Sequence, residues 1–147
     1  MSKKINQGFT IIEVLIVVAI ITVLAAVALP VSYSFLNKND LNLTSQKIVQ
    51  TIRRAQFLAQ ANDSDSTWGV HVQLGSATIF KGASYLARDT TRDEVYTFPD
   101  NETFSGTTDF LFSKLTGYPT TAGSLTITSS DTAAKSIILN TRGTIQY

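Results

Sequence analysis

An apolar run near the N-terminus constrains the fold of this chain more than any other feature. Residues 14–29 are all apolar except Thr22. Extended to residues 9–36, the run gives a helix of roughly 40 Å at about 1.5 Å per residue. About 20 apolar residues are enough to cross the hydrocarbon core of a bilayer. The run therefore predicts one membrane-spanning helix over residues 9–36.

The charges that precede this run predict its orientation. Lys3 and Lys4 stand before it, and the first eight residues contain no acid. Because lysine and arginine are retained on the cytoplasmic side of a membrane, we expect a cytoplasmic N-terminus and an extracytoplasmic remainder. The expected location is the cell (inner) membrane, crossed once.

A single carboxylate interrupts the apolar segment. Glu13 lies near its start, and an ionised side chain in contact with lipid costs a few kcal/mol, on the order of 2.5 to 3.5 for comparable charges. An anchor alone does not need such a residue, so Glu13 is a candidate functional group with a cationic partner. The alternative is a solvated residue at the membrane interface that has no role.

The residues around Glu13 carry a resemblance. The sequence Lys3-Lys4-Ile5-Asn6-Gln7-Gly8, followed by Phe9-Thr10-Ile11-Ile12-Glu13, resembles the prepilin signal of type IV pilins and type II secretion pseudopilins. The resemblance implies a leader at residues 1–8, cleavage after Gly8 by a prepilin peptidase, and N-methylation of Phe9. It also implies that Glu13 acts in assembly, by neutralising the N-terminal amine of a neighbouring subunit.

Two other interpretations of the segment stay open from the sequence. A secretory signal peptide has a basic start, an apolar stretch and small residues at its cleavage site, for which Ala26-Val27-Ala28 could serve. It does not account for the helix-compatible residues that follow, nor for Glu13. A plain uncleaved anchor accounts for the hydrophobicity alone.

The predicted helix continues beyond the apolar run. Pro30 removes one backbone donor and clashes with the carbonyl of Ala26, so a kink or a short irregular stretch is expected near residues 26–30. Residues 37–62 then form an amphipathic continuation of the helix, because apolar residues recur there with a period of about 3.6. This stripe consists of Leu41, Ile48, Ile52, Ala55 and Ala59.

Residues 63–147 have the pattern of a globular β-rich head. From Thr67 the period becomes two, with Trp68, Val70, Val72 and Leu74 predicted on one buried strand face, and a Gly75-Ser76 turn before a second strand at 77–80. Further strands are predicted at 95–98, 110–112, 125–128, 136–139 and 144–147. We expect an antiparallel sheet, or two small ones, wrapped on the helix. The fold class is α+β, and it resembles the pilin fold.

The chain has 147 residues and no cysteine. Thiol catalysis, thiolate metal sites and disulfides are therefore excluded. Many Gram-negative major pilins close their C-terminal region with a disulfide, and this chain departs from that pattern. The order of the C-terminal strands is similar to that of H-type and FimT-like minor pseudopilins, which favours a minor subunit.

Residues able to carry out catalysis are sparse. His71 is the only histidine, and strand alternation predicts that it faces solvent. The serines lack a nucleophile setting such as G-x-S-x-G. Asn62, Asp63 and Asp65 faintly resemble an acidic calcium loop but lack the glycine and the glutamate of an EF-hand, so they form either a metal site or a solvated turn, and we favour the turn. We predict that the chain is not an enzyme and has no cofactor or metal.

The resulting hypothesis is a structural subunit of a type IV pilus or a type II secretion-like filament. Its expected partners are other pilin or pseudopilin subunits, the prepilin peptidase and methyltransferase, and the inner-membrane assembly platform. The alternative is a DNA-binding minor pilin that acts in DNA uptake. Residues 62–147 hold six basic and nine acidic side chains, a net charge of −3, and Arg142 alone stands where a basic loop could form. Because nucleic-acid binding needs clustered cations, the sequence disfavours this alternative.

Overall fold

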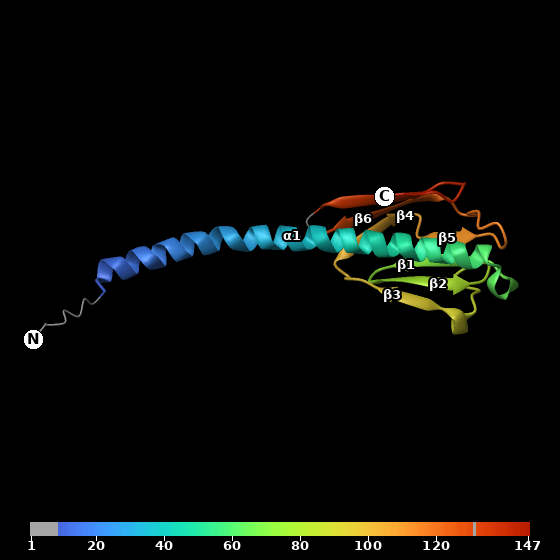
Figure 1. Ribbon diagram of the computed structural model, residues 1–147, viewed down its shortest axis with the longest axis horizontal. Helices are drawn as coiled ribbons and strands as arrows, with labels where there is room; N and C mark the ends of the chain where they lie inside the picture. Colours follow the sequence, from blue (N-terminus) through green and yellow to red (C-terminus); the bar gives the residue numbers. More distant parts are fainter. Residues whose placement is uncertain (1–8, 131) are drawn as a thin grey trace, which may run out of the picture. The chain divides into compact units, whose positions relative to one another are not determined.

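The computed structural model describes residues 9–130 and 132–147, and for residues 27–37 it describes the backbone alone. A long helix, α1 (Ile11–Gln60), is followed by short antiparallel strands (Figure 1). The chain divides into two compact units, Met1–Leu36 and Asn37–Tyr147. We call the second the head unit. The order of a long helix and then sheets confirms the predicted α+β class and fits the pilin fold.

Identifiable residues set the start and the end of α1. At its start the Glu13 backbone N donates to Thr10 Oγ1 over 3.3 Å, so Thr10 acts as the N-cap. At its end Asn62 takes a left-handed backbone conformation, φ 52°, and the backbone N of Leu115 donates to Ala59 O over 2.9 Å. That bond satisfies one of the last helical carbonyls, and the helix ends two residues before the predicted boundary.

The structure assigns α1 without interruption across residue 30. The Pro30 side chain lies outside the described side chains, and the kink that we expect there stays a prediction. The leader at residues 1–8, with Gly8, also lies outside the described residues.

The head unit contains two four-stranded antiparallel sheets, which confirms the expectation of two small sheets. The first has the order β3-β2-β1-β5 and is built from β1 (Trp68–Gln73), β2 (Ser76–Lys81), β3 (Glu94–Thr97) and β5 (Asp109–Phe112). The second has the order β4-β6-β7-β8 and is built from β4 (Glu102–Gly106), β6 (Gly123–Ser129), β7 (Ala134–Leu139) and β8 (Ile145–Gln146). Figure 1 shows the sheets flanking the part of α1 that belongs to this unit.

Two details of the strand prediction were wrong. Leu74, predicted on a buried strand face, lies with Gly75 in the turn between β1 and β2 and is exposed. The register pairs Gln73 with Ser76, so the turn is Leu74-Gly75 and not Gly75-Ser76, and Gly75 takes the left-handed φ of 74° that glycine tolerates. Strand β4 was not predicted, because its sequence has few large apolar residues and directly follows the turn signal of residues 99–101.

The apolar stripe of α1 forms one side of the core, as predicted. Its five members are all buried, together with Val49, and they join buried side chains from both sheets. The sheet residues are Trp68, Val70, Val72, Ala77, Ile79, Phe98, Phe110, Phe112, Leu125, Ile127, Ile137 and Leu139. Since burying one large aliphatic or aromatic side chain stabilises a fold by about 1.5 to 3 kcal/mol, this cluster fixes both sheets on the helix.

His71 does not lie free in solvent as predicted. Its side chain is 21% exposed, and Nδ1 lies 2.8 Å from Asp109 Oδ1. Its ring stacks on the ring of Tyr85, with the two centroids 3.9 Å apart. The Arg88 guanidinium lies 3.8 Å from the centroid of the Tyr85 ring. The loop at residues 82–89 therefore folds back over the outer face of β1. The alternation of apolar and polar residues along β1 could not predict this contact.

Candidate functional site

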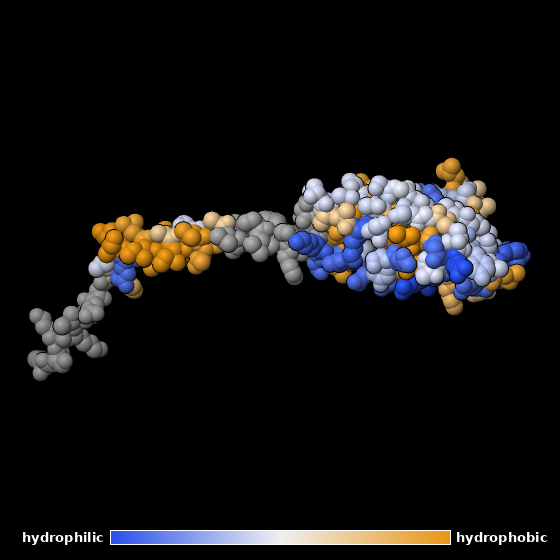
Figure 2. All heavy atoms as spheres, turned by 90° about the horizontal axis from the view of Figure 1, so that it is seen from above, coloured by the Kyte–Doolittle hydropathy of each residue, from blue (hydrophilic) through white to orange (hydrophobic). Residues whose placement is uncertain are grey.

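The described part of the N-terminal unit is a helix whose apolar side chains are exposed and are not covered by any other described residues. Every residue from 9 to 26 is exposed. The large apolar side chains among them are Phe9, Ile11, Ile12, Val14, Leu15, Ile16, Val17, Val18, Ile20, Ile21, Val23 and Leu24. Figure 2 shows this segment as a nearly continuous orange surface, whereas the surface of the head unit is mostly blue and white. Contiguous exposed apolar surface of this kind marks a site of interaction with protein or membrane.

Glu13 lies in the first turn of α1 and shares a surface with Phe9, Val14, Val17 and Val18. Its side chain is exposed. Among the residues that the structure describes, no side chain forms an ion pair with it. The carboxylate is therefore available to a group outside the chain, and it points out from the same apolar surface that the chain leaves uncovered.

Thr10 adds a feature that the sequence analysis missed. Thr10 and Glu13 have the spacing of a capping box, in which the first side chain accepts from the backbone of the second. A negative charge in the first turn also interacts favourably with the helix dipole. The signal was present in the sequence as Thr-x-x-Glu, and it gives Glu13 a local role in starting the helix.

Within the part of the chain that the structure describes, no helix is both long enough and apolar enough to cross a bilayer.

The comparisons with known proteins agree with the N-terminal geometry. Residues 3–29 match a family model described as the prokaryotic N-terminal methylation motif. This motif is typical of type IV pilins and pseudopilins, and it supports the resemblance on which the sequence interpretation rests. No solved structure matches the chain. The match ends within α1, so the head unit is described from its own residues.

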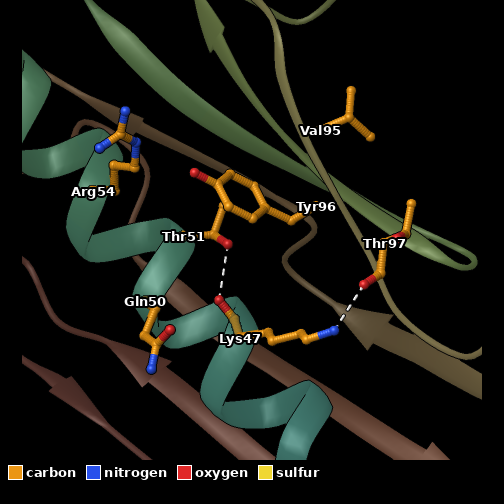
Figure 3. A pocket seen from close by; sticks show the side chains of 7 residues that line it. All are labelled: Lys47, Gln50, Thr51, Arg54, Val95, Tyr96 and Thr97. Carbon is orange, nitrogen blue, oxygen red and sulfur yellow. Dashed lines mark hydrogen bonds between the residues drawn. The ribbon is translucent and has the colours of Figure 1, made fainter.

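In the head unit, a groove of about 510 Å³ separates α1 from the edge strand β3. Lys47 Nζ donates to Thr97 O over 3.1 Å, and Arg54 binds both carboxylate oxygens of Glu94 at 2.6 and 2.7 Å. The Tyr96 hydroxyl donates to the same carboxylate over 2.9 Å. Figure 3 shows the side chains of α1 on one side of the groove and those of β3 on the other. These bonds tie the edge strand to the helix.

The charges at this groove shift each other's titration. Hydrogen bonds from Arg54 hold the pKa of Glu94 below its ordinary value, while burial acts in the opposite direction and is the weaker influence. The same pair raises the pKa of Arg54. The ion pair is partly exposed, with side chains that are 50% and 33% accessible, so it fixes geometry more than it stabilises the fold.

A buried carboxyl group is the least expected feature of the head unit. Glu102, the first residue of β4, is 1% exposed, and neither of its oxygens has a hydrogen-bond partner. Burial raises the pKa of Glu102, Asp40 acts in the same direction, and the facing Thr44 hydroxyl opposes them. Its only sequence signal was the spacing to Phe104, which packs on the core.

The acidic turn after α1 takes part in ordinary structural contacts. Asp65 forms an ion pair with Lys114 at 3.0 Å, which lowers the pKa of Asp65. The carbonyl of Asp63 accepts a hydrogen bond from the Trp68 indole over 3.1 Å. Within the described residues, no cluster of three or more His, Cys, Asp or Glu side chains is placed to hold a metal ion.

Some basic side chains of the head unit, which DNA binding would need, form ion pairs, and others are exposed. Arg88 pairs with Asp93 at 2.8 Å and Lys114 with Asp65. Arg142 is exposed, and its backbone N donates to Asn140 Oδ1 in the turn before β8. These contacts do not test the DNA-uptake alternative, which the sequence disfavours.

Proposed function

We propose that the chain is a structural subunit of a type IV pilus or type II secretion-like filament. In this proposal the leader is cut after Gly8, Phe9 is methylated, and mature subunits associate through residues 9–36. The observation that carries the proposal is the exposed apolar surface of residues 9–26. A helix that is apolar on all sides requires lipid or other apolar helices around it.

Before assembly the subunit is held in the inner membrane by this segment, crossing it once with the N-terminus in the cytoplasm. Lys3 and Lys4 support this orientation. The prepilin peptidase acts on the leader there, and the inner-membrane assembly platform then transfers the subunit to the filament. The subunit is of the minor, H-type or FimT-like class, a choice supported by the absence of cysteine and the order of the C-terminal strands.

Glu13 serves this assembly by pairing with the amine of Phe9 in the neighbouring subunit. The exposed carboxylate without an ion-pair partner supports the role. An ion pair in a low-dielectric bundle is unfavourable unless both charges are present, so it selects the register in which they meet. The capping contact with Thr10 uses the backbone of Glu13 and leaves its carboxylate available.

Filament incorporation tests this role. Glu13→Ala should leave cleavage intact and lower the amount of the chain in sheared filaments at least tenfold, because the register contact is lost. The measurement is immunoblotting of filament and membrane fractions. Thr22→Val is a matched control, since Thr22 is the other polar residue deep in the segment and its hydroxyl bonds only its own helix, at Ala19 O. Normal incorporation of Glu13→Ala would remove the role.

A further inference from the structure

We propose that Glu102, Asp40 and Thr44 bind a divalent cation of the calcium class in the head unit. The site joins α1, which carries Asp40 and Thr44, to the first residue of β4. It is separate from the N-terminal segment and from the groove beside β3.

The carboxyl group of Glu102 needs a partner that the described residues do not supply. The side chain is 1% exposed and both oxygens lack a hydrogen bond. An unpaired carboxylate in a protein interior is unfavourable by several kcal/mol, and buried polar atoms in native proteins are nearly always satisfied. Thr44 Oγ1 is also fully buried and forms no hydrogen bond of good geometry among the described residues. It lies close enough to the Glu102 carboxyl to lower the pKa of that group.

The charges near Glu102 are of one sign. Asp40 is the charged group that acts on it, and the ion pairs of the described residues do not include Glu102. Lys135, which reaches α1 from β7, contacts Ser45 Oγ over 3.5 Å and lies 5.8 Å from the Tyr147 ring centre. On the sheet side, Glu102 pairs with Ser129, which is buried and uncharged. Among the described residues, no basic side chain forms an ion pair with the cluster.

The donor atoms select the class of cation. Carboxylate and hydroxyl oxygens are hard ligands, and calcium accepts six to eight of them in flexible geometry, often with water among them. Asp40 is only half-buried, which leaves its side of the site open to water and to the entering ion. The chain has no cysteine, and His71 lies on β1, so the cluster has none of the softer ligands that zinc or copper prefers.

Thermal unfolding tests the site in the full chain held in detergent micelles. Calcium chloride at 10 mM should raise the unfolding temperature by about 5 °C over EDTA at equal ionic strength, as expected for a site with a Kd of roughly 1 mM. Glu102→Gln keeps the shape of the side chain but should lose the response. Glu94→Gln is the matched control, because it removes a carboxylate at the other groove and should keep the response.

A second variant covers the case in which Glu102→Gln does not fold. Asp40 is half-buried, so Asp40→Asn should fold and require at least tenfold more calcium for the same rise. Equal unfolding temperatures of the wild-type chain in calcium and in EDTA would overturn the proposal. Stabilisation by acid alone, without any response to calcium, would also overturn it, because a proton would then neutralise Glu102. An equal rise with magnesium would overturn the assignment to the calcium class.

Discussion

The two parts of α1 present their apolar residues in opposite ways. In residues 9–26 these side chains are exposed on every face, whereas in the head unit they form one stripe that is buried against two sheets. Helix periodicity explains both patterns, since a stripe needs one partner surface and an all-round apolar helix needs surroundings that are apolar throughout. Among the described residues, the stripe of the head unit has its partner surface in the two sheets, whereas residues 9–26 have no partner surface.

The largest expected effect is a difference in stability between the same substitution made in the buried stripe and in the exposed segment. Ile52→Ala in the buried stripe should lower the free energy of unfolding of the head unit by 2 to 5 kcal/mol, because it leaves a cavity between α1 and the sheets. Ile16→Ala, the same change on the exposed segment, should alter it by less than about 0.5 kcal/mol. Denaturant unfolding of both variants in detergent measures the effect. Equal losses would show that residues 9–26 pack within the subunit after all.

A smaller effect is expected from the Arg54–Glu94 ion pair, which joins the polar side of α1 to β3. Because Arg54 holds the pKa of Glu94 below its ordinary value, the folded state binds fewer protons than the unfolded state near that value. The stability from this pair is therefore complete above pH 5 and is lost as the pH falls through the lowered pKa of Glu94. The contribution is at most about 1 kcal/mol, because both side chains are partly exposed.

Stability curves between pH 2 and pH 7 for wild-type protein and Glu94→Gln measure this contribution. The curves should differ above pH 5 and converge in acid. A constant difference across that range would show that the variant acts by packing and not by charge.

The features that were predictable depend on local pattern. The period of the α1 stripe, the alternation of Val70 and Val72, and the motif around Gly8 and Phe9 are each encoded within a few residues. The features that were missed depend on distant contacts. Glu102 is buried by residues that precede it by about sixty positions, and His71 is covered by a loop that its own strand does not predict.

Strand β4 depends on both local sequence and distant contacts. Its residues pair with Leu125 to Ser129 of β6, and that pairing, more than its own composition, makes it a strand. The same distinction applies to the candidate site. The sequence located Glu13 because a charge in an apolar run is conspicuous, whereas Thr10 became evident as its capping partner once the helix start was seen.

The central claim is that the leader is cleaved from the N-terminal segment, which then associates with the same segment of other subunits. Intact-mass analysis of the protein purified from its own membranes, with sequencing of the N-terminal peptide, tests this most directly. The account predicts a chain that begins at Phe9, with a methyl group on its amine, and predicts that Gly8→Ala retains the leader. A chain that begins at or near Val31, or one that keeps Met1, would contradict it.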